Sequence, residues 1–163
     1  HWRSFDESLM APIGQIWLLL GKALVGVLRG MVSSVAFLVM AAIMSPGLHI
    51  EPPFFISLLL CCLIFSFLGV LSALLARTYD DMIAFSSIFI MPMAFLGGTF
   101  FSLTYLPSDL RYVIYLLPLT HASICLRSSL LGQTVPDASL FALMAFLTLF
   151  SGASLLVLRR KDA

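Results

Sequence analysis

The chain has 163 residues, of which 61% are hydrophobic and 10% are charged. Soluble domains carry about 25% charged residues, so this composition excludes an ordinary soluble protein and indicates one compact membrane domain. The net charge of +1, with nine scattered Lys and Arg residues, excludes binding to nucleic acid along a phosphate track.

The first 22 residues are more polar than the apolar run that follows them. A short polar element with Asp6 and Glu7 precedes Pro12, and an amphipathic or interfacial turn then leads to Lys22 at the membrane edge. The chain begins with His rather than Met, so we expect a fragment or a processed product.

Four apolar runs are each long enough to cross about 30 Å of hydrocarbon as a helix of about 20 residues. They are expected at Ala23–Ser45, Phe54–Ala76, Met82–Leu103 and Ala138–Leu158. The runs are continuously apolar, whereas the strands of a membrane barrel alternate between apolar and polar residues. The sequence therefore predicts an all-α, polytopic membrane bundle with four transmembrane helices.

The first run carries a stripe of small and polar residues. Lys22, Gly26, Arg29, Gly30 and Ser33 share one helix face, because a helix advances about 100° per residue. Small residues four positions apart allow another helix to approach closely. We expect a packing face or dimer seam whose cations reach the cytoplasmic interface. A helix that lines a pore is the alternative interpretation.

The Lys and Arg residues near the span ends indicate the orientation, since such cations concentrate on the cytoplasmic side. With four spans they all fall on one side; they are Arg3, Lys22, Arg77, Arg159, Arg160 and Lys161. The loop between the first two spans contains no Lys or Arg. We therefore expect both chain ends in the cytoplasm.

The segment Gly97–Arg127 interrupts the apolar pattern before the last run with prolines and charges. A fifth crossing there would carry Arg111 and Arg127 through lipid, at about 2.5–3.5 kcal/mol for each charge at a helix centre. It would also place the C-terminal cations outside the cell. We therefore expect a segment that enters from outside and returns, with Arg127 as a headgroup or capping contact, or as a fixed cation at an outer gate.

This segment is predicted to form a re-entrant or interfacial helical hairpin. Ser108 is a candidate N-cap with Asp109 in the first turn, and Pro118 breaks the first short helix. A second short helix is expected over about Thr120–Leu131, with Gly132 as its C-cap. Irregular backbone at membrane depth has to be covered by protein or to line a cavity.

The residues that carry chemistry in enzymes form no convincing site. Asp80 and Asp81 are neighbours at a helix boundary, whereas paired catalytic carboxylates would come from two helices; we expect them to cap the third span. His121 lies near several serines, but no nucleophile elbow surrounds them. We expect no catalytic, cofactor-binding or metal-binding residue, and we interpret the three cysteines as small hydrophobic side chains.

The stretch YDDMIAFSSIFIMPMAFLGGTFFSLTYLPSDLRYVIYLLPLTHASICLRSSLLG resembles the C-terminal signature of ABC-2 type transporter permeases, in the branch with drug-efflux, nodulation-factor and polysaccharide exporters. The matching residues are Asp80, Asp81, Pro92, Gly97, Gly98, Phe100, Phe101, Leu106, Pro107, Pro118 and Arg127. Upstream, Glu7–Pro12 is similar to the family pattern E-L-L-x-x-P, with Ser8 at the first leucine. Leu117 departs from the Asn that usually precedes this proline in the family.

The resemblance implies a permease with six spans, of which this chain would hold the last four. It implies export of an amphipathic cargo (a drug, a lipid, a glycolipid or a polysaccharide) across the plasma membrane, with an ABC ATPase subunit and a second permease copy as partners and lipid around them. It assigns Asp6, Glu7 and Pro12 to a cytoplasmic element that couples to the ATPase. The residues that it places at the outer gate or hairpin are Gly97, Gly98, Phe100, Pro107, Pro118 and Arg127.

We therefore expect a single membrane domain over residues 1–163. Residues 1–22 would form the coupling and interfacial element, 23–158 the transmembrane bundle and 159–163 a cytoplasmic tail. Two alternatives to a permease stay open at this point: an intramembrane enzyme, and a small membrane scaffold or assembly protein.

Overall fold

The computed structural model describes residues 15–44, 52–76, 78–97 and 114–161. Every regular element in these ranges is helical, and four helices are long and apolar enough to cross a membrane, which confirms the predicted fold class. The helices are α2 (Gln15–Met44), α3 (Pro52–Leu75), α4 (Tyr79–Phe85), the π-helix η1 (Ser86–Ile90), α5 (Met91–Leu96), α7 (Pro118–Leu130) and α8 (Asp137–Lys161).

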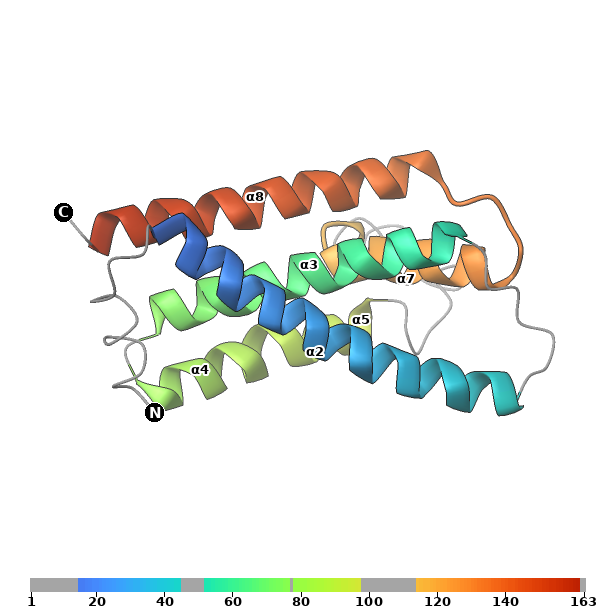
Figure 1. The fold of residues 1–163 in the computed structure, drawn as a ribbon, viewed down its shortest axis with the longest axis horizontal. Helices are drawn as coiled ribbons and strands as arrows, with labels where there is room; N and C mark the ends of the chain where they lie inside the picture. The colour runs from blue at the N-terminus through green and yellow to red at the C-terminus, as the bar shows by residue number, and fades with distance from the viewer. Residues whose placement is uncertain (1–14, 45–51, 77, 98–113, 162–163) are drawn as a thin grey trace.

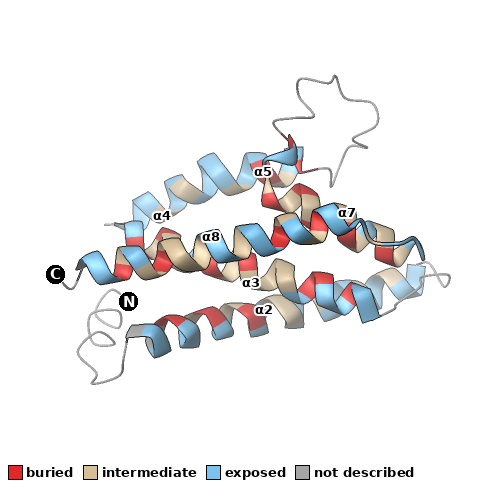
Figure 2. Ribbon diagram, turned by 90° about the horizontal axis from the view of Figure 1, so that it is seen from above, coloured by how far each residue is buried: buried red, intermediate tan, exposed pale blue. Residues whose placement is uncertain are grey.

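Helix α3 lies in the middle of the bundle and packs against α2, α8 and α7 (Figure 1). The beginning of α2, the end of α3 and the end of α8 lie at one end of the bundle, while the connection from α7 to α8 lies at the other (Figure 1). Helices α4, η1 and α5 follow one another as a single rod on the side of α3 away from α2 (Figure 2). The short helix α7 covers only the first half of α3, which lies away from the C-terminus of the chain (Figure 1).

The observed helix boundaries differ most from expectation at the beginning of α2. This helix begins at Gln15 and continues to Met44, so the residues expected to form a separate interfacial turn are its first two turns. No proline interrupts this stretch, and Gly21 alone costs a helix only about 1 kcal/mol. Helices α3 and α8 begin within two residues of the predicted positions.

A capping box begins the third span at Tyr79. The hydroxyl of Thr78 accepts a hydrogen bond from the backbone N–H of Asp81 at 3.2 Å, and the Asp81 carboxylate accepts one from the Thr78 N–H at 2.9 Å. Each side chain thus satisfies a donor that the first helical turn leaves open. The predicted capping role at this boundary is confirmed for Asp81.

Two buried clusters hold the bundle together. The first joins α2, α3 and α8 through Leu19, Ala23, Phe67, Leu74 and Leu158. The second joins α3, α7 and α8 through Ile64, Ala122, Cys125 and Leu143. Helices α3 and α8 contribute to both clusters, and α3 also contacts α2, α4 and α7, so α3 carries most of the tertiary packing of the described chain.

The third span, Tyr79–Leu96, packs much less closely than α3. Only 6% of its apolar window is buried, against 33% for α3, and Met93 is its one buried side chain. It contacts α3 near its beginning and α7 near its end. Within it, the Met91 N–H bonds to the Ser86 carbonyl five residues earlier, directly before Pro92, which has no N–H to donate.

Candidate functional site

Helices α2 and α3 approach each other closely along the predicted stripe of small residues. A Cβ added at Gly30 would lie 3.1 Å from the Sγ of Cys62, and one added at Gly26 would meet the hydroxyl of Ser66. That hydroxyl donates a hydrogen bond to the backbone carbonyl of Ala23 at 2.6 Å. The two glycines therefore face α3 of the same chain, where they make room for an interhelical hydrogen bond.

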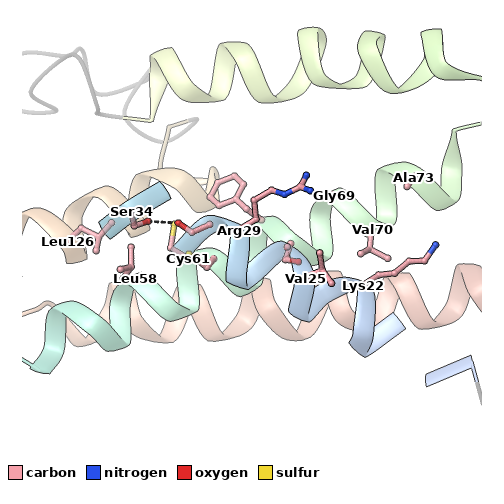
Figure 3. Close-up of a pocket in the computed structure, with 15 residues that line it drawn as sticks. Lys22, Val25, Arg29, Ser34, Leu58, Cys61, Gly69, Val70, Ala73 and Leu126 are labelled. Carbon is pink, nitrogen blue, oxygen red and sulfur yellow. Dashed lines mark hydrogen bonds between the residues drawn. The ribbon is translucent and has the colours of Figure 1, made fainter. Parts of the chain in front are cut away.

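A groove of about 630 Å³ runs along this seam, and we call it the α2–α3 groove (Figure 3). Lys22, Gly26, Arg29 and Gly30 line it, whereas Ser33 is exposed outside it and bonds through its hydroxyl to the Arg29 carbonyl at 3.1 Å. The remaining lining residues are mostly apolar or small; they are Val25, Ser34, Leu58, Cys61, Cys62, Phe65, Ser66, Gly69, Val70, Ala73 and Leu126.

Sequence reasoning missed the α3 side of this groove. Cys62, Ser66, Gly69 and Ala73 recur at spacings of three and four, which places small residues on one face of α3. This spacing matches that of the α2 stripe. It is the signal that could have identified α3 as the partner of α2.

Helix α7 begins at Pro118, two residues before the predicted beginning at Thr120, and ends at Leu130, one residue before the predicted end. Pro118 occupies the first helical turn, where a missing N–H costs nothing. Gly132 has φ of 66°, its N–H bonds to the Ser129 carbonyl at 3.3 Å, and the Gln133 N–H bonds to the Ser128 carbonyl at 2.9 Å. These two bonds form a Schellman motif in which Leu131 is the C-cap residue and Gly132 follows it, so Gly132 ends the helix as predicted.

The beginning of α7 is tied to the turn before it. Leu117 is the N-cap residue and provides no side-chain hydrogen bond to the helix. The hydroxyl of Thr120 instead donates to the Ile114 carbonyl at 2.7 Å, in a fully buried position. The beginning of the predicted first helix of the hairpin, with Ser108 and Asp109, lies outside the described residues, whereas Ile114 and Tyr115 near its end are helical.

The end of the third span is held against α7 at Gly97. The hydroxyl of Ser123 lies 2.8 Å from the Gly97 carbonyl and 2.9 Å from the Thr120 carbonyl, so its single hydrogen is shared between these two acceptors. A Cβ at Gly97 would lie 2.9 Å from a methyl carbon of Leu119 and 2.8 Å from the Met93 carbonyl. Gly97 therefore allows a contact that a larger residue would obstruct.

His121 connects α7 to both of its neighbouring segments. Its Nε2 lies 2.9 Å from the Tyr115 carbonyl, which can only accept, so this nitrogen carries the proton. Its Nδ1 lies 3.5 Å from the hydroxyl of Ser139 at the beginning of α8. The nearby serine of α7, Ser123, bonds to Gly97 instead, so the arrangement is that of a structural link between helices.

Arg127 lies in the last turn of α7, where a cation interacts favourably with the helix dipole. It is exposed and lines a cavity of about 410 Å³ between α3 and α7 whose other walls are mostly apolar. Pro118 is buried at the other end of the same helix. The remaining predicted site residues, which are Asp6, Glu7, Pro12, Gly98, Phe100 and Pro107, lie outside the described residues.

Comparison with known proteins identifies relatives for most of the chain. The inner membrane transport permease YadH of Escherichia coli K12 is 28% identical over 151 residues, which are 91% of this chain and 59% of that protein. Nodulation protein J of Neorhizobium galegae is 36% identical over 101 residues, which are 61% of this chain and 38% of the relative. No solved structure matches.

The chain thus spans about 59% of the length of the permease that it resembles. The family model described as ABC-2 type transporter matches residues 3–131, which include α2, α3, the third span and α7. This match covers well over half of the chain, and the four apolar helices suit a multi-pass membrane protein. The chain therefore belongs to the ABC-2 type transporter family.

Proposed function

We propose that this chain forms the last four spans of a permease subunit in an ATP-driven exporter. A separate ABC ATPase subunit would hydrolyse ATP, and the permease would move an amphipathic cargo, such as a drug, a lipid or a glycolipid or polysaccharide, out of the cell. The observation that carries this proposal is the family match over residues 3–131, joined by relatives named as a transport permease and a nodulation protein.

The proposed orientation has both chain ends in the cytoplasm and the spans in the plasma membrane. It is supported by Lys22 at the beginning of α2 and by Arg159 and Arg160 at the end of α8, since these ends lie together in the bundle (Figure 1). Cations concentrate on the cytoplasmic side of membrane proteins. In this orientation α7 occupies the outer half of the membrane.

The proposed coupling runs from the ATPase through α2. Asp6, Glu7 and Pro12 would dock on the ATPase, and they precede a continuous helix of 30 residues, about 45 Å long. A helix of this length without a proline can transmit a displacement along its axis. The small residues Gly26 and Gly30 would permit movement against α3.

The proposed outer gate includes Gly97, Gly98, Phe100, Pro107, Pro118 and Arg127. Support comes from the hydrogen bond between Ser123 and Gly97, through which movement of the third span would reach α7. The third span and α2 both leave most of their surface uncovered in the described part of the chain, and these surfaces suit contact with a second permease copy. We propose a dimer of permeases for this reason.

The coupling proposal is tested in proteoliposomes that hold the full permease with its ATPase subunit. Glu7→Ala and Pro12→Gly should abolish most ATP-dependent export while ATP hydrolysis and protein amount persist. Glu51→Ala, which lies between α2 and α3 in the sequence, is the matched acidic control and should export normally. Normal export by both coupling variants would refute the assignment of the coupling residues. Chemical conversion of a substrate by the chain without any ATPase would instead favour an intramembrane enzyme.

A further inference from the structure

The α2–α3 groove combines two cations with an apolar floor. Among the described residues, Lys22 and Arg29 are the only charged ones that line the groove, so no Asp or Glu lies beside them there. Figure 3 shows both side chains extending toward the end of the groove where α2 begins. This direction follows from helix geometry, because side chains tilt toward the N-terminus of their helix.

The depth of these cations follows from the length of α2. If Met44 marks one membrane interface, the roughly 20 residues needed to cross the hydrocarbon reach back to about Val25. Lys22 then lies at the opposite interface, and Arg29 lies about one turn inside it, with its guanidinium directed back toward the headgroups. Both side chains are thus directed toward the headgroups of the same leaflet (Figure 3).

The groove extends inward from this point along the seam. Its α2 lining runs from Lys22 to Ser34, about 18 Å along the helix axis, and one leaflet of hydrocarbon is about 15 Å thick. Gly69 leaves the α3 side of the groove open, because a Cβ there would meet nothing within 4 Å. An occupant that suits the groove therefore has an anionic head and one long apolar chain beneath it.

We propose that the α2–α3 groove is a binding site for an anionic phospholipid. Lys22 and Arg29 attract its anionic headgroup at the end of the groove where α2 begins, and one acyl chain lies along the inner part of the groove that is lined by Gly30, Leu58 and Cys62 (Figure 3). A free anion lacks the apolar part that would fill the groove, and a zwitterionic lipid carries a cation that Lys22 and Arg29 repel. The proposal needs only the membrane-spanning fold and does not depend on export.

The test is native mass spectrometry of the purified chain after exchange into mixed phosphatidylglycerol and phosphatidylcholine. The wild-type chain should retain phosphatidylglycerol in preference to phosphatidylcholine. Lys22→Gln with Arg29→Gln should lower the affinity for phosphatidylglycerol about tenfold or more, since each cation near the surface contributes about 1 kcal/mol. The charge-matched control Arg159→Gln with Arg160→Gln, at the same end but outside the groove, should retain the preference.

A second pair of variants tests the apolar floor without touching a charge. A Cβ at Gly69 or at Gly152 meets nothing within 4 Å, so the two glycines are matched at this atom, but only Gly69 lines the groove. Gly69→Leu should displace the retained lipid, and Gly152→Leu on α8 should not. Equal retention of both lipids by the wild type, or unchanged retention in Gly69→Leu, would overturn the proposal. The proposal would also be overturned if Gly69→Leu dissociated a dimer of the chain while the lipid stayed bound.

Discussion

The hydroxyl of Ser66 on α3 donates a hydrogen bond to the backbone carbonyl of Ala23 on α2, 43 residues earlier, at 2.6 Å. Gly26 lies one turn further along α2 and leaves the space that this hydroxyl occupies. Since association of helices in lipid depends on close packing and interhelical hydrogen bonds, this pair holds the seam together.

Gly26→Ala should therefore destabilise the bundle, by about 1–3 kcal/mol, because the new methyl group displaces the Ser66 hydroxyl from Ala23. Gly69→Ala is the matched control, since a Cβ there meets nothing within 4 Å and Ala favours a helix by about 1 kcal/mol over Gly. Thermal unfolding in detergent should show a lower Tm for Gly26→Ala and an equal or higher Tm for the control. A Tm that rises equally in both would contradict the close contact.

Ser123→Ala should loosen the outer end of the third span. The variant removes the hydrogen bond to the Gly97 carbonyl, which is worth about 0.5–1.5 kcal/mol, while α7 itself keeps its backbone bonds. Hydrogen exchange should become faster at the end of α5 and stay unchanged in α4. Ser151→Ala on α8, whose hydroxyl bonds only within its own helix, is the control and should leave exchange in α5 unaffected.

Leu117→Asn should stabilise α7. Leu117 is the N-cap residue of this helix, and its side chain makes no capping bond. Asn is among the best N-cap residues, and the change from an apolar residue is worth about 1 kcal/mol. The Tm of the variant in detergent should rise, whereas Leu116→Asn, one residue outside the cap and exposed, should leave it unchanged. A fall in Tm for Leu117→Asn would show that packing of Leu117 outweighs the cap.

The thiol of Cys125 should react slowly and only at high pH. The side chain is fully buried between α3, α7 and α8, and burial raises the pKa of its thiol above the ordinary value of about 8.5. The folded state keeps this proton to a higher pH than the unfolded state does. Its contribution to stability is therefore present below the ordinary pKa and is lost as the pH rises above it.

Maleimide labelling checks this in a variant that lacks Cys61 and Cys62. Labelling of Cys125 should be slow at neutral pH. The control is Gln133→Cys at an exposed position, and the rate of its labelling should increase at a lower pH than the rate for Cys125 does. Rapid labelling of Cys125 at neutral pH would show that α7 separates from α3 and α8 under these conditions.

The proposed orientation predicts opposite labelling of the two ends of the bundle. In a cysteine-free variant, Gln133→Cys should react with an impermeant maleimide from outside intact cells. Arg160→Cys should react only after the membrane is opened. The cysteine is placed at Gln133 rather than at the neighbouring Gly132, because the φ of 66° at Gly132 disfavours any side chain. Labelling of Gln133→Cys only from the cytoplasm would reverse the orientation of the whole bundle.

The features that the sequence determined by itself are those that depend on residues close together in the chain. Long apolar runs identified the four spans, Pro118 indicated the break between two short helices, Gly132 marked the end of α7, and Asp81 indicated the cap of the third span. Each depends on hydrophobicity over about 20 residues or on backbone chemistry within one turn.

Only the tertiary structure decided which faces meet. The bonds from Ser66 to Ala23 and from Ser123 to Gly97 join residues 43 and 26 positions apart, and the small residues of α2 pack on α3 of the same chain. In lipid the outer surface of a helix is as apolar as its packed surface, so the hydrophobic pattern does not distinguish them. The partner of each face is therefore set by shape and by a few hydrogen bonds, which appear only when the helices are assembled.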